Sequence, residues 1–170
     1  MKRQQYKIII AGGRDFNDYT LLTKVCNEAI PRMAGDNTPV IVSGGAAGAD
    51  SLGEQYAQEN GIAIERHPAD WKKHGKAAGP IRNAEMAACA DFLIAFWDGK
   101  SRGTQNMMMN AVKKDIPCIV VTYNTSDTLN SNIKKRIEML GEHFNEKESR
   151  DELYTLIHQF ISGKKKRNHE

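Results

Sequence analysis

Three glycine-containing segments of this sequence carry residue types that hold phosphate groups in proteins. Glycine lets backbone N–H groups come close to an anion, and a helix that starts in such a loop adds unpaired N–H groups and the positive end of its dipole. The segments are Gly12-Gly13-Arg14-Asp15-Phe16, Ser43-Gly44-Gly45-Ala46-Ala47-Gly48-Ala49-Asp50 and Gly99-Lys100-Ser101-Arg102-Gly103-Thr104. Phosphate is therefore the ligand group that these segments predict.

Each segment also has a purely structural interpretation, because strand-to-helix turns commonly use glycine. The hydroxyls of Ser43, Ser101 and Thr104 could bind phosphate oxygens, or they could cap the helices that follow. Both interpretations stay open for each hydroxyl taken alone. Three such segments at one edge of a sheet favour a ligand site.

The long connection from Pro68 to Asn83 supplies a second set of candidates. We expect it to be an irregular loop, and long irregular loops in compact domains are usually functional. Trp71 and Trp97 offer aromatic faces on which a base could stack. Asp70 and Asp98 could accept hydrogen bonds from ribose or amino groups, and the Arg82 guanidinium could bind phosphate. Alternatively, both tryptophans cover the core and the charges are solvated.

The sequence predicts neither a metal site nor a cofactor. His67 and His74 lie close together, but no third ligand follows at a useful spacing. The three cysteines Cys26, Cys89 and Cys118 are widely spaced among apolar neighbours, which is typical of reduced core thiols.

Five short apolar strands alternate with helices along most of the chain. The expected strands are 6–11, 40–42, one around 62–64, 92–96 and 117–122. One helix lies between the first two strands and is closed or kinked near Pro31, and another spans about 80–90. Parallel strands need such crossovers, so the pattern predicts a doubly wound, mainly parallel Rossmann-like sheet with helices on both faces. The glycine segments then meet at its carboxyl edge.

We expect residues 1–162 to form a single domain that ends in a helical extension over 123–162. Its last helix carries an apolar stripe at Leu153, Leu156, Ile157 and Phe160, which predicts docking on the sheet or on a partner subunit, hence a homo-oligomer. Residues 163–170 are polar and basic and are expected to be a disordered tail.

Composition narrows the functional class. Of the 170 residues 40% are hydrophobic and 26% charged, which is ordinary for a globular protein. We expect a cytoplasmic protein, because the chain has neither an apolar run of roughly 20 residues nor a signal-peptide core. The net charge of +3 resides in Lys164, Lys165, Lys166, Arg167 and Glu170. The neutral body argues against an extended nucleic-acid surface.

The motifs taken in order resemble the SLOG superfamily, in particular its YspA/YpsA-related branch. They are Gly-Gly-Arg-Asp-Phe at 12–16, Ser-Gly-Gly-Ala at 43–46 followed by Gly48-Ala49-Asp50, Pro-Ala-Asp-Trp at 68–71, Gly-Pro-Ile-Arg-Asn at 79–83 and Ser-Arg-Gly-Thr at 101–104. The resemblance covers about residues 8–122. It implies a Rossmann-like fold and a site for nucleotides or nucleotide-derived signals such as ADP-ribose-like molecules, with Arg82 and Asn83 at that site.

The wider superfamily includes phosphoribohydrolases, which cut the N-glycosidic bond of nucleoside monophosphates with a catalytic Arg and Glu, and a DNA-processing protein that binds single strands. Here Arg82 matches the Arg, whereas Met107 stands at the Glu position. Hydrolysis needs a carboxylate to activate water and stabilise an oxocarbenium-like state, which a thioether cannot do. We therefore place ligand binding without turnover first.

Two other functions remain as alternatives. The first is nucleotide hydrolysis that uses Arg82 and a carboxylate from another loop, for which the candidates are Asp15, Asp50, Glu54 and Asp98. The second is binding of single-stranded nucleic acid by Trp71, Trp97, Lys72, Lys73 and the basic tail, which the neutral body disfavours.

Overall fold

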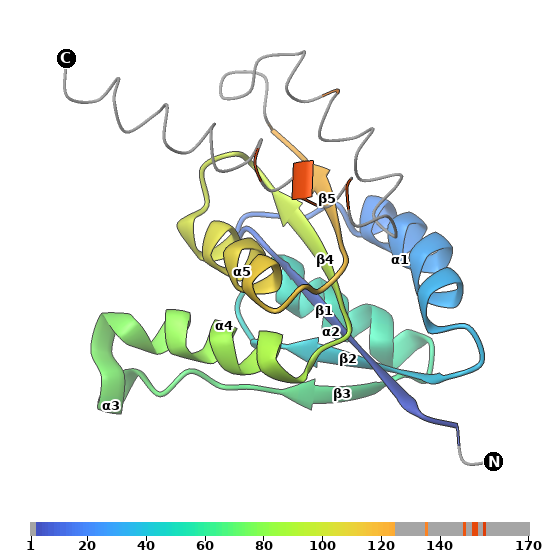
Figure 1. The fold of residues 1–170 in the computed structure, drawn as a ribbon. Helices are drawn as coiled ribbons and strands as arrows, with labels where there is room; N and C mark the ends of the chain where they lie inside the picture. Colours follow the sequence, from blue (N-terminus) through green and yellow to red (C-terminus); the bar gives the residue numbers. More distant parts are fainter. Residues whose placement is uncertain (1–2, 125–134, 136–147, 149–150, 153–154, 156–170) are drawn as a thin grey trace.

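The computed structural model describes residues 3–124 together with residues 135, 148, 151–152 and 155 (Figure 1). The helical extension predicted over 123–162, with its apolar stripe, lies outside the described residues apart from 123–124 and these few positions. The basic tail predicted over 163–170 lies wholly outside them.

A parallel sheet of five strands forms the centre of the described region, as predicted. The strands are β1 (Gln5–Gly12), β2 (Thr38–Ser43), β3 (Ala63–Arg66), β4 (Phe92–Trp97) and β5 (Cys118–Thr122). Their order is β3-β2-β1-β4-β5, and every neighbouring pair is parallel. The chain moves outward from β1 to β3 and then returns to the other side of β1 at β4. The switch point, where a Rossmann-like sheet opens a ligand crevice, therefore lies between the carboxyl ends of β1 and β4.

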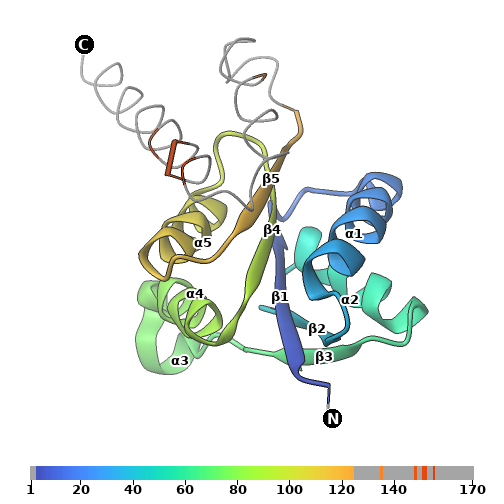
Figure 2. The same ribbon diagram turned by 45° about the vertical axis from the view of Figure 1, so that its right-hand side comes forward.

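Helices cover both faces of this sheet (Figure 2). Helices α1 (Tyr19–Ala34) and α2 (Ala49–Glu59) cover one face, and α4 (Ala78–Cys89) and α5 (Arg102–Lys113) cover the other. The short helix α3 (Trp71–His74) and the 3-10 turn η1 (Gly75–Ala77) lead into α4.

Strand β4 shows why the sheet strands read as continuous apolar runs. All six of its residues are buried. Phe92, Ile94 and Phe96 pack toward α1 and α2, and Leu93, Ala95 and Trp97 pack toward α4 and α5. A strand covered on both faces has no solvent side, so both of its alternating side-chain sets are hydrophobic. Each large side chain buried in this way contributes about 1.5–3 kcal/mol.

Helix α1 includes Pro31 and ends close to it, at Ala34. The capping residue Gly35 has a left-handed φ of 53°, and its N–H donates to the Pro31 carbonyl. One sequence-based prediction of local structure needs correction. The connection after β3 is helical rather than irregular. The Asp70 carboxylate accepts a hydrogen bond from the Lys73 N–H at 3.0 Å and caps α3, and Pro80 occupies the first turn of α4, where its missing N–H costs nothing.

No helix in the described part of the chain is long and apolar enough to cross a membrane. Cys26 and Cys118 are buried core thiols, as predicted. Cys89 differs, because it is only half-buried and has polar neighbours, which are described below.

Candidate functional site at the switch point

A cavity of about 560 Å³ opens at the carboxyl ends of β1 and β4. The segment after β1, the loops before α2 and α5, and the first turns of α4 and α5 form its walls. Fourteen of the predicted ligand residues line it. They are Gly12, Gly13, Arg14, Asp15, Ala46, Asp50, Trp71, Arg82, Asn83, Asp98, Ser101, Arg102, Gly103 and Thr104. The volume falls in the range of small-molecule sites.

Close backbone packing under the cavity requires glycine at two positions. A Cβ on Gly12 would lie 2.5 Å from the Phe96 carbonyl oxygen and 2.8 Å from the Ala49 Cβ. Gly48 has a φ of 79°, which L side chains rarely adopt, and it lies against the backbone of the first glycine segment. The two loops can therefore lie side by side only because both positions lack a side chain.

Arg82 is held at the cavity wall by one contact to the loop before α2 and one contact within α4. Its Nη1 donates to the Gly44 carbonyl, and its Nε donates to Asn83 Oδ1 at 3.1 Å. A Cβ on Gly44 would lie 2.5 Å from the Arg82 Nη1, so the glycine makes room for the guanidinium. The remaining N–H groups of a fork-shaped guanidinium are suited to an anion in the cavity.

Asp50 is a buried carboxylate in the first turn of α2, with 6% of its surface exposed. Its Oδ2 accepts a hydrogen bond from the Ala46 N–H at 3.3 Å. Burial raises the pKa of Asp50 to about 6, and the backbone hydrogen bonds from Ala46 and Gly44 and the positive charge of Arg82 only partly oppose this rise. The group therefore titrates close to neutral pH, which is unusual for an aspartate.

The start of α5 forms a third wall. Ser101 is the N-cap, its Oγ lies 2.9 Å from Thr104 Oγ1, and Asp98 Oδ1 accepts hydrogen bonds at 2.8 Å from the N–H groups of Lys100 and Ser101. Capping is therefore a role that Ser101 plays in this structure. Asn83 ties α4 to α5 through a bond from its Nδ2 to Asn106 Oδ1 at 3.1 Å.

The cavity lining contains equal numbers of positive and negative side chains, but the two kinds differ in how far they are already paired. Three arginines, Arg14, Arg82 and Arg102, face three carboxylates in its lining. Asp15 accepts a hydrogen bond from the Tyr123 hydroxyl at 2.6 Å, and the carboxylates at 50 and 98 accept backbone N–H groups. Within residues 3–124 none of the three arginines forms an ion pair. Arg14 and Arg102 thus lack a paired carboxylate within this range, whereas the positive charge of Arg82 acts on Asp50.

Several predicted ligand residues support the site from outside the cavity instead of lining it. Trp97 is fully buried among the side chains of α4 and α5, so its ring is not exposed for stacking, and the core alternative was right for it. Phe16 is also buried and stacks on Phe96 at 4.5 Å. The Ser43 hydroxyl accepts the Gly45 N–H at 3.1 Å. Gly44, Gly45, Gly48 and Asp70 likewise shape or cap the loops around the cavity.

Six lining residues were not among the predicted ligand residues: Ala11, Gly79, Pro80, Met86, Asn106 and Met107. Met107 was noted only as the position where related hydrolases carry Glu, and it lines the cavity with 2% exposure. Nothing in the sequence around Asn106 indicates a ligand-binding role. Its position near the start of the helix that Ser101 caps could have marked it as a lining residue.

A separate polar cluster lies on the sheet beside the far end of α4. Glu65, His67 and Cys89 place one donor atom each within 4.8 Å of one another, which is the spacing of a metal-binding group. The sequence paired His67 with His74 and found no third ligand. In the structure His74 belongs to α3, and the partners of His67 come from β3 and from the end of α4.

Comparison with known proteins relates this chain to a protein family, to a phage protein and to a solved structure. Residues 6–74 match the YAcAr family, described as the YspA, cpYpsA-related SLOG family. The Gene 61 protein of Mycobacterium phage D29 is 38% identical over 119 residues, which are 66% of this chain and 94% of that protein. The X-ray structure of DNA processing protein A (DprA) from Streptococcus pneumoniae superposes with a TM-score of 0.54 at 19% identity, over 73% of this chain and 52% of that one. This chain thus spans about half the length of that solved structure, and the likeness extends to the fold.

Proposed function

We propose that this chain, which belongs to the YspA, cpYpsA-related SLOG family, binds a nucleotide or a nucleotide-derived ligand in the switch-point cavity and senses or sequesters it. Membership of the family implies a nucleotide-related ligand-binding domain. The finer part of the proposal is the class of ligand, a nucleoside monophosphate or an ADP-ribose-like molecule, and its retention without turnover.

One observation carries this proposal: three arginines and the N-terminus of α5 converge on a single cavity of about 560 Å³. The first N–H groups of a helix have no intrahelical partner and carry the positive end of its dipole. Together with guanidinium groups they form an environment that favours phosphate over a neutral ligand.

The cavity also offers a surface that suits a base. Trp71 lines the cavity with 52% of its surface exposed, and its ring lies over Gly79, where an added Cβ would be 3.4 Å away. An exposed indole next to an anion site offers a stacking surface for any base. The Asp98 carboxylate and the Asn106 amide, which also line the cavity, suit ribose hydroxyls.

The residue at position 107 supports binding without turnover. Met107 lines the cavity where a hydrolase of the superfamily carries its catalytic Glu, and its thioether neither activates water nor stabilises a cationic transition state.

The test is native mass spectrometry of the full chain with AMP, NAD, ADP-ribose and cyclic nucleotides, scoring bound intact ligand and released base together. We expect intact ligand and no free base. Arg102→Ala should weaken binding about ten- to 100-fold, the equivalent of one charge-assisted hydrogen bond. Arg102 is exposed in the first turn of α5, so this change leaves the fold intact.

Arg66→Ala is the matched control. Arg66 is also an exposed arginine, but it pairs with Glu54 at 3.0 Å and is not part of the cavity lining. Its removal should leave binding unchanged. If no nucleotide binds at micromolar concentrations, or if both variants weaken binding equally, the proposal is wrong.

A second candidate function, nucleotide N-glycoside hydrolysis, is favoured by one specific observation. Asp50 is a buried carboxyl in the cavity wall, and its pKa of about 6 suits a general base near neutral pH. Asp50→Asn would then abolish release of free base while intact ligand still binds. Absence of base release from every nucleotide in the panel would eliminate this candidate.

Binding of single-stranded nucleic acid is weaker as a function, because the burial of Trp97 removes one of its two stacking residues. Homo-oligomerisation and a cytoplasmic location stay predictions. Light scattering on the full chain measures the first.

A further inference from the structure

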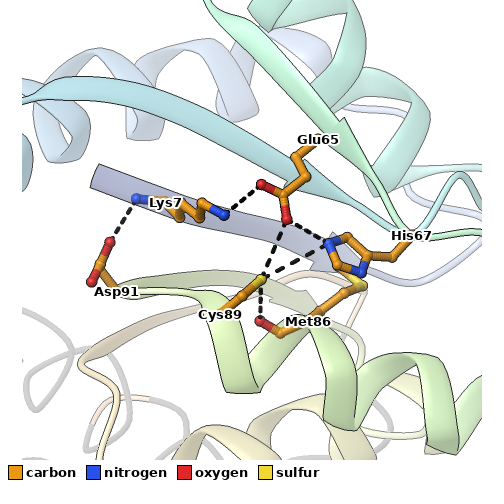
Figure 3. Close-up of polar contacts among 6 residues, drawn as sticks. All are labelled: Lys7, Glu65, His67, Met86, Cys89 and Asp91. Atoms are coloured by element: carbon orange, nitrogen blue, oxygen red, sulfur yellow. Dashed lines mark hydrogen bonds and ion pairs between the residues drawn. The ribbon is translucent and has the colours of Figure 1, made fainter. Parts of the chain in front are cut away.

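The cluster of Glu65, His67 and Cys89 lies apart from the cavity, and its donor atoms converge on one point (Figure 3). His67 Nε2 lies 2.7 Å from Glu65 Oε1, Cys89 Sγ lies 3.5 Å from the same oxygen, and Cys89 Sγ lies 3.8 Å from His67 Nε2. All three side chains are half-buried, so solvent and small ions reach them.

Sheet register and the length of α4 bring these residues together. Glu65 pairs with Val42 in the β2–β3 ladder, and Val42 packs on the face that α4 and α5 cover. The His67 N–H donates to the Ser43 carbonyl at 2.9 Å, which extends this ladder by one further bond. Cys89 is the last residue of α4 and projects toward the same place.

A cysteine nucleophile with a His–Glu pair would need a different geometry. In such a triad one ring nitrogen of the histidine contacts the nucleophile and the other contacts the carboxylate. Here Nε2 is close to both the thiol and Glu65 Oε1. Burial and the Glu65 carboxylate also raise the pKa of the Cys89 thiol, which is the opposite of activation.

We propose that Glu65, His67 and Cys89 form a binding site for a divalent transition-metal ion of the zinc type, with the fourth coordination position left to water. Thiolate sulfur, imidazole nitrogen and carboxylate oxygen are the ligands that zinc takes in proteins. Bonds of about 2.0–2.3 Å in a tetrahedral site place ligand atoms about 3.3–3.7 Å apart. The distance of 3.5 Å from Cys89 Sγ to Glu65 Oε1 falls in this range, and the distance of 3.8 Å from Cys89 Sγ to His67 Nε2 is slightly longer. The contact of 2.7 Å between His67 and Glu65 has to open.

Lys7 strengthens this assignment. Its Nζ lies 2.6 Å from Glu65 Oε2, which fixes the carboxylate and leaves Oε1 directed at the other two donors. The backbone N–H of Lys7 in turn donates to Asp91 at 2.8 Å, which anchors the strand at this point. Outer partners that orient ligands in this way are typical of metal sites. Two ligand anions and Zn²⁺ balance in charge, so the site also tolerates the neighbouring ammonium.

The site would join β3 to the end of α4 and does not depend on the proposed nucleotide function. None of its three ligands lines the cavity. An experiment that disproves zinc binding therefore leaves the nucleotide proposal untouched, and the converse also holds.

The test is a zinc titration of the reduced full chain against a chromophoric chelator, with Co²⁺ as a spectroscopic probe. We expect one Zn²⁺ per chain and a thiolate-to-cobalt absorption band. Cys89→Ser and His67→Gln should each weaken zinc binding by at least about tenfold, the lower bound for losing even an outer-shell partner. Cys89→Ser should also abolish the cobalt band.

Matched controls separate this site from other donors in the chain. His74→Gln changes an exposed histidine of α3, and Cys118→Ala changes a core thiol; both should retain zinc binding and the cobalt band. Circular dichroism confirms that each variant is folded. If the folded chain binds no zinc, or if Cys89→Ser and His67→Gln bind it as well as the unchanged protein does, the proposal is wrong.

Discussion

Asp50 should cost this protein stability at neutral pH, and the size of that cost can be worked out. Its pKa rises from an ordinary value of 3.8 to about 6 because burial penalises the charged form. At about 1.4 kcal/mol for each pH unit, this difference corresponds to about 3 kcal/mol. A raised pKa means that the folded state binds the proton more tightly than the unfolded chain. The contribution of Asp50 to stability is thus fully present below about pH 4 and is lost as the pH rises through about 6.

Asp50→Asn removes this titration while it keeps the shape of the side chain and an oxygen that accepts the Ala46 N–H. We expect the free energy of unfolding of the variant, relative to the unchanged protein, to increase by about 3 kcal/mol between about pH 4 and about pH 7.5. Urea denaturation of both proteins at a series of pH values measures this difference. Groups other than Asp50 titrate in both proteins and cancel in the comparison.

Asp36→Asn is the matched control, because Asp36 is exposed in the turn after α1 and its charge remains in water. This variant removes an exposed carboxylate in place of a buried one. If the difference curve of Asp50→Asn is the same as that of Asp36→Asn, Arg82 and the backbone N–H groups fully compensate the buried charge. Asp50 would then be a poor candidate for a general base near neutral pH, because its proton affinity would be that of an ordinary aspartate.

Three further predictions concern packing, the tryptophans and the metal. Gly12→Ala should destabilise the fold by about 1–3 kcal/mol, because its Cβ would meet a backbone oxygen of β4. Gly103→Ala should stabilise the fold by about 0.5–1 kcal/mol, because its Cβ meets nothing within 4 Å. Thermal unfolding of the two variants distinguishes these effects. Trp97→Ala should cost about 3–5 kcal/mol of stability, while Trp71→Ala should cost under about 0.5 kcal/mol but weaken nucleotide binding by about 1 kcal/mol or more in calorimetry. Zinc at about 100 times its Kd should stabilise the folded protein by about 2.7 kcal/mol, an effect absent from Cys89→Ser.

The sheet and its helices could be predicted because each element carries a complete local signal. A run such as Phe92–Phe96 is too short and too apolar for an amphipathic helix, and the glycine segments mark where each strand must end. The boundaries were less accurate. The connection before α4 was misjudged, because the hydrogen bond from Lys73 to Asp70 and the position of Pro80 become evident only in the folded backbone.

The site was predictable to the extent that topology alone places it. Parallel strands end at one edge, so Gly12, Ala46 and Asp98 had to lie close together. Which side chains face the cavity depends on parity along a strand. Trp97 continues the alternation of Leu93 and Ala95 and therefore points into the core beneath α5, a consequence of β4 being one residue longer than predicted.

Tertiary contacts between distant parts of the chain were beyond sequence reasoning. Glu65 and Cys89 are separated by 24 positions, and they meet only because the end of α4 lies close to β3 in the folded chain. Spacing rules search for ligands within one turn or hairpin, so they considered His67 only together with His74.

Helix α4 carries residues of both proposed sites, which constrains how they can influence each other. Arg82 and Cys89 are seven residues apart on the helix, or about 10 Å at 1.5 Å per residue, so a metal ion at one end makes no contact with a ligand at the other. Any effect of zinc on nucleotide affinity must then act without contact, through a shift of α4 or through the charge of the ion. Such coupling is reciprocal, because linkage requires the nucleotide to change zinc affinity by the same factor. If zinc alters nucleotide binding but the converse factor differs, the two ligands interact in solution, and α4 transmits nothing.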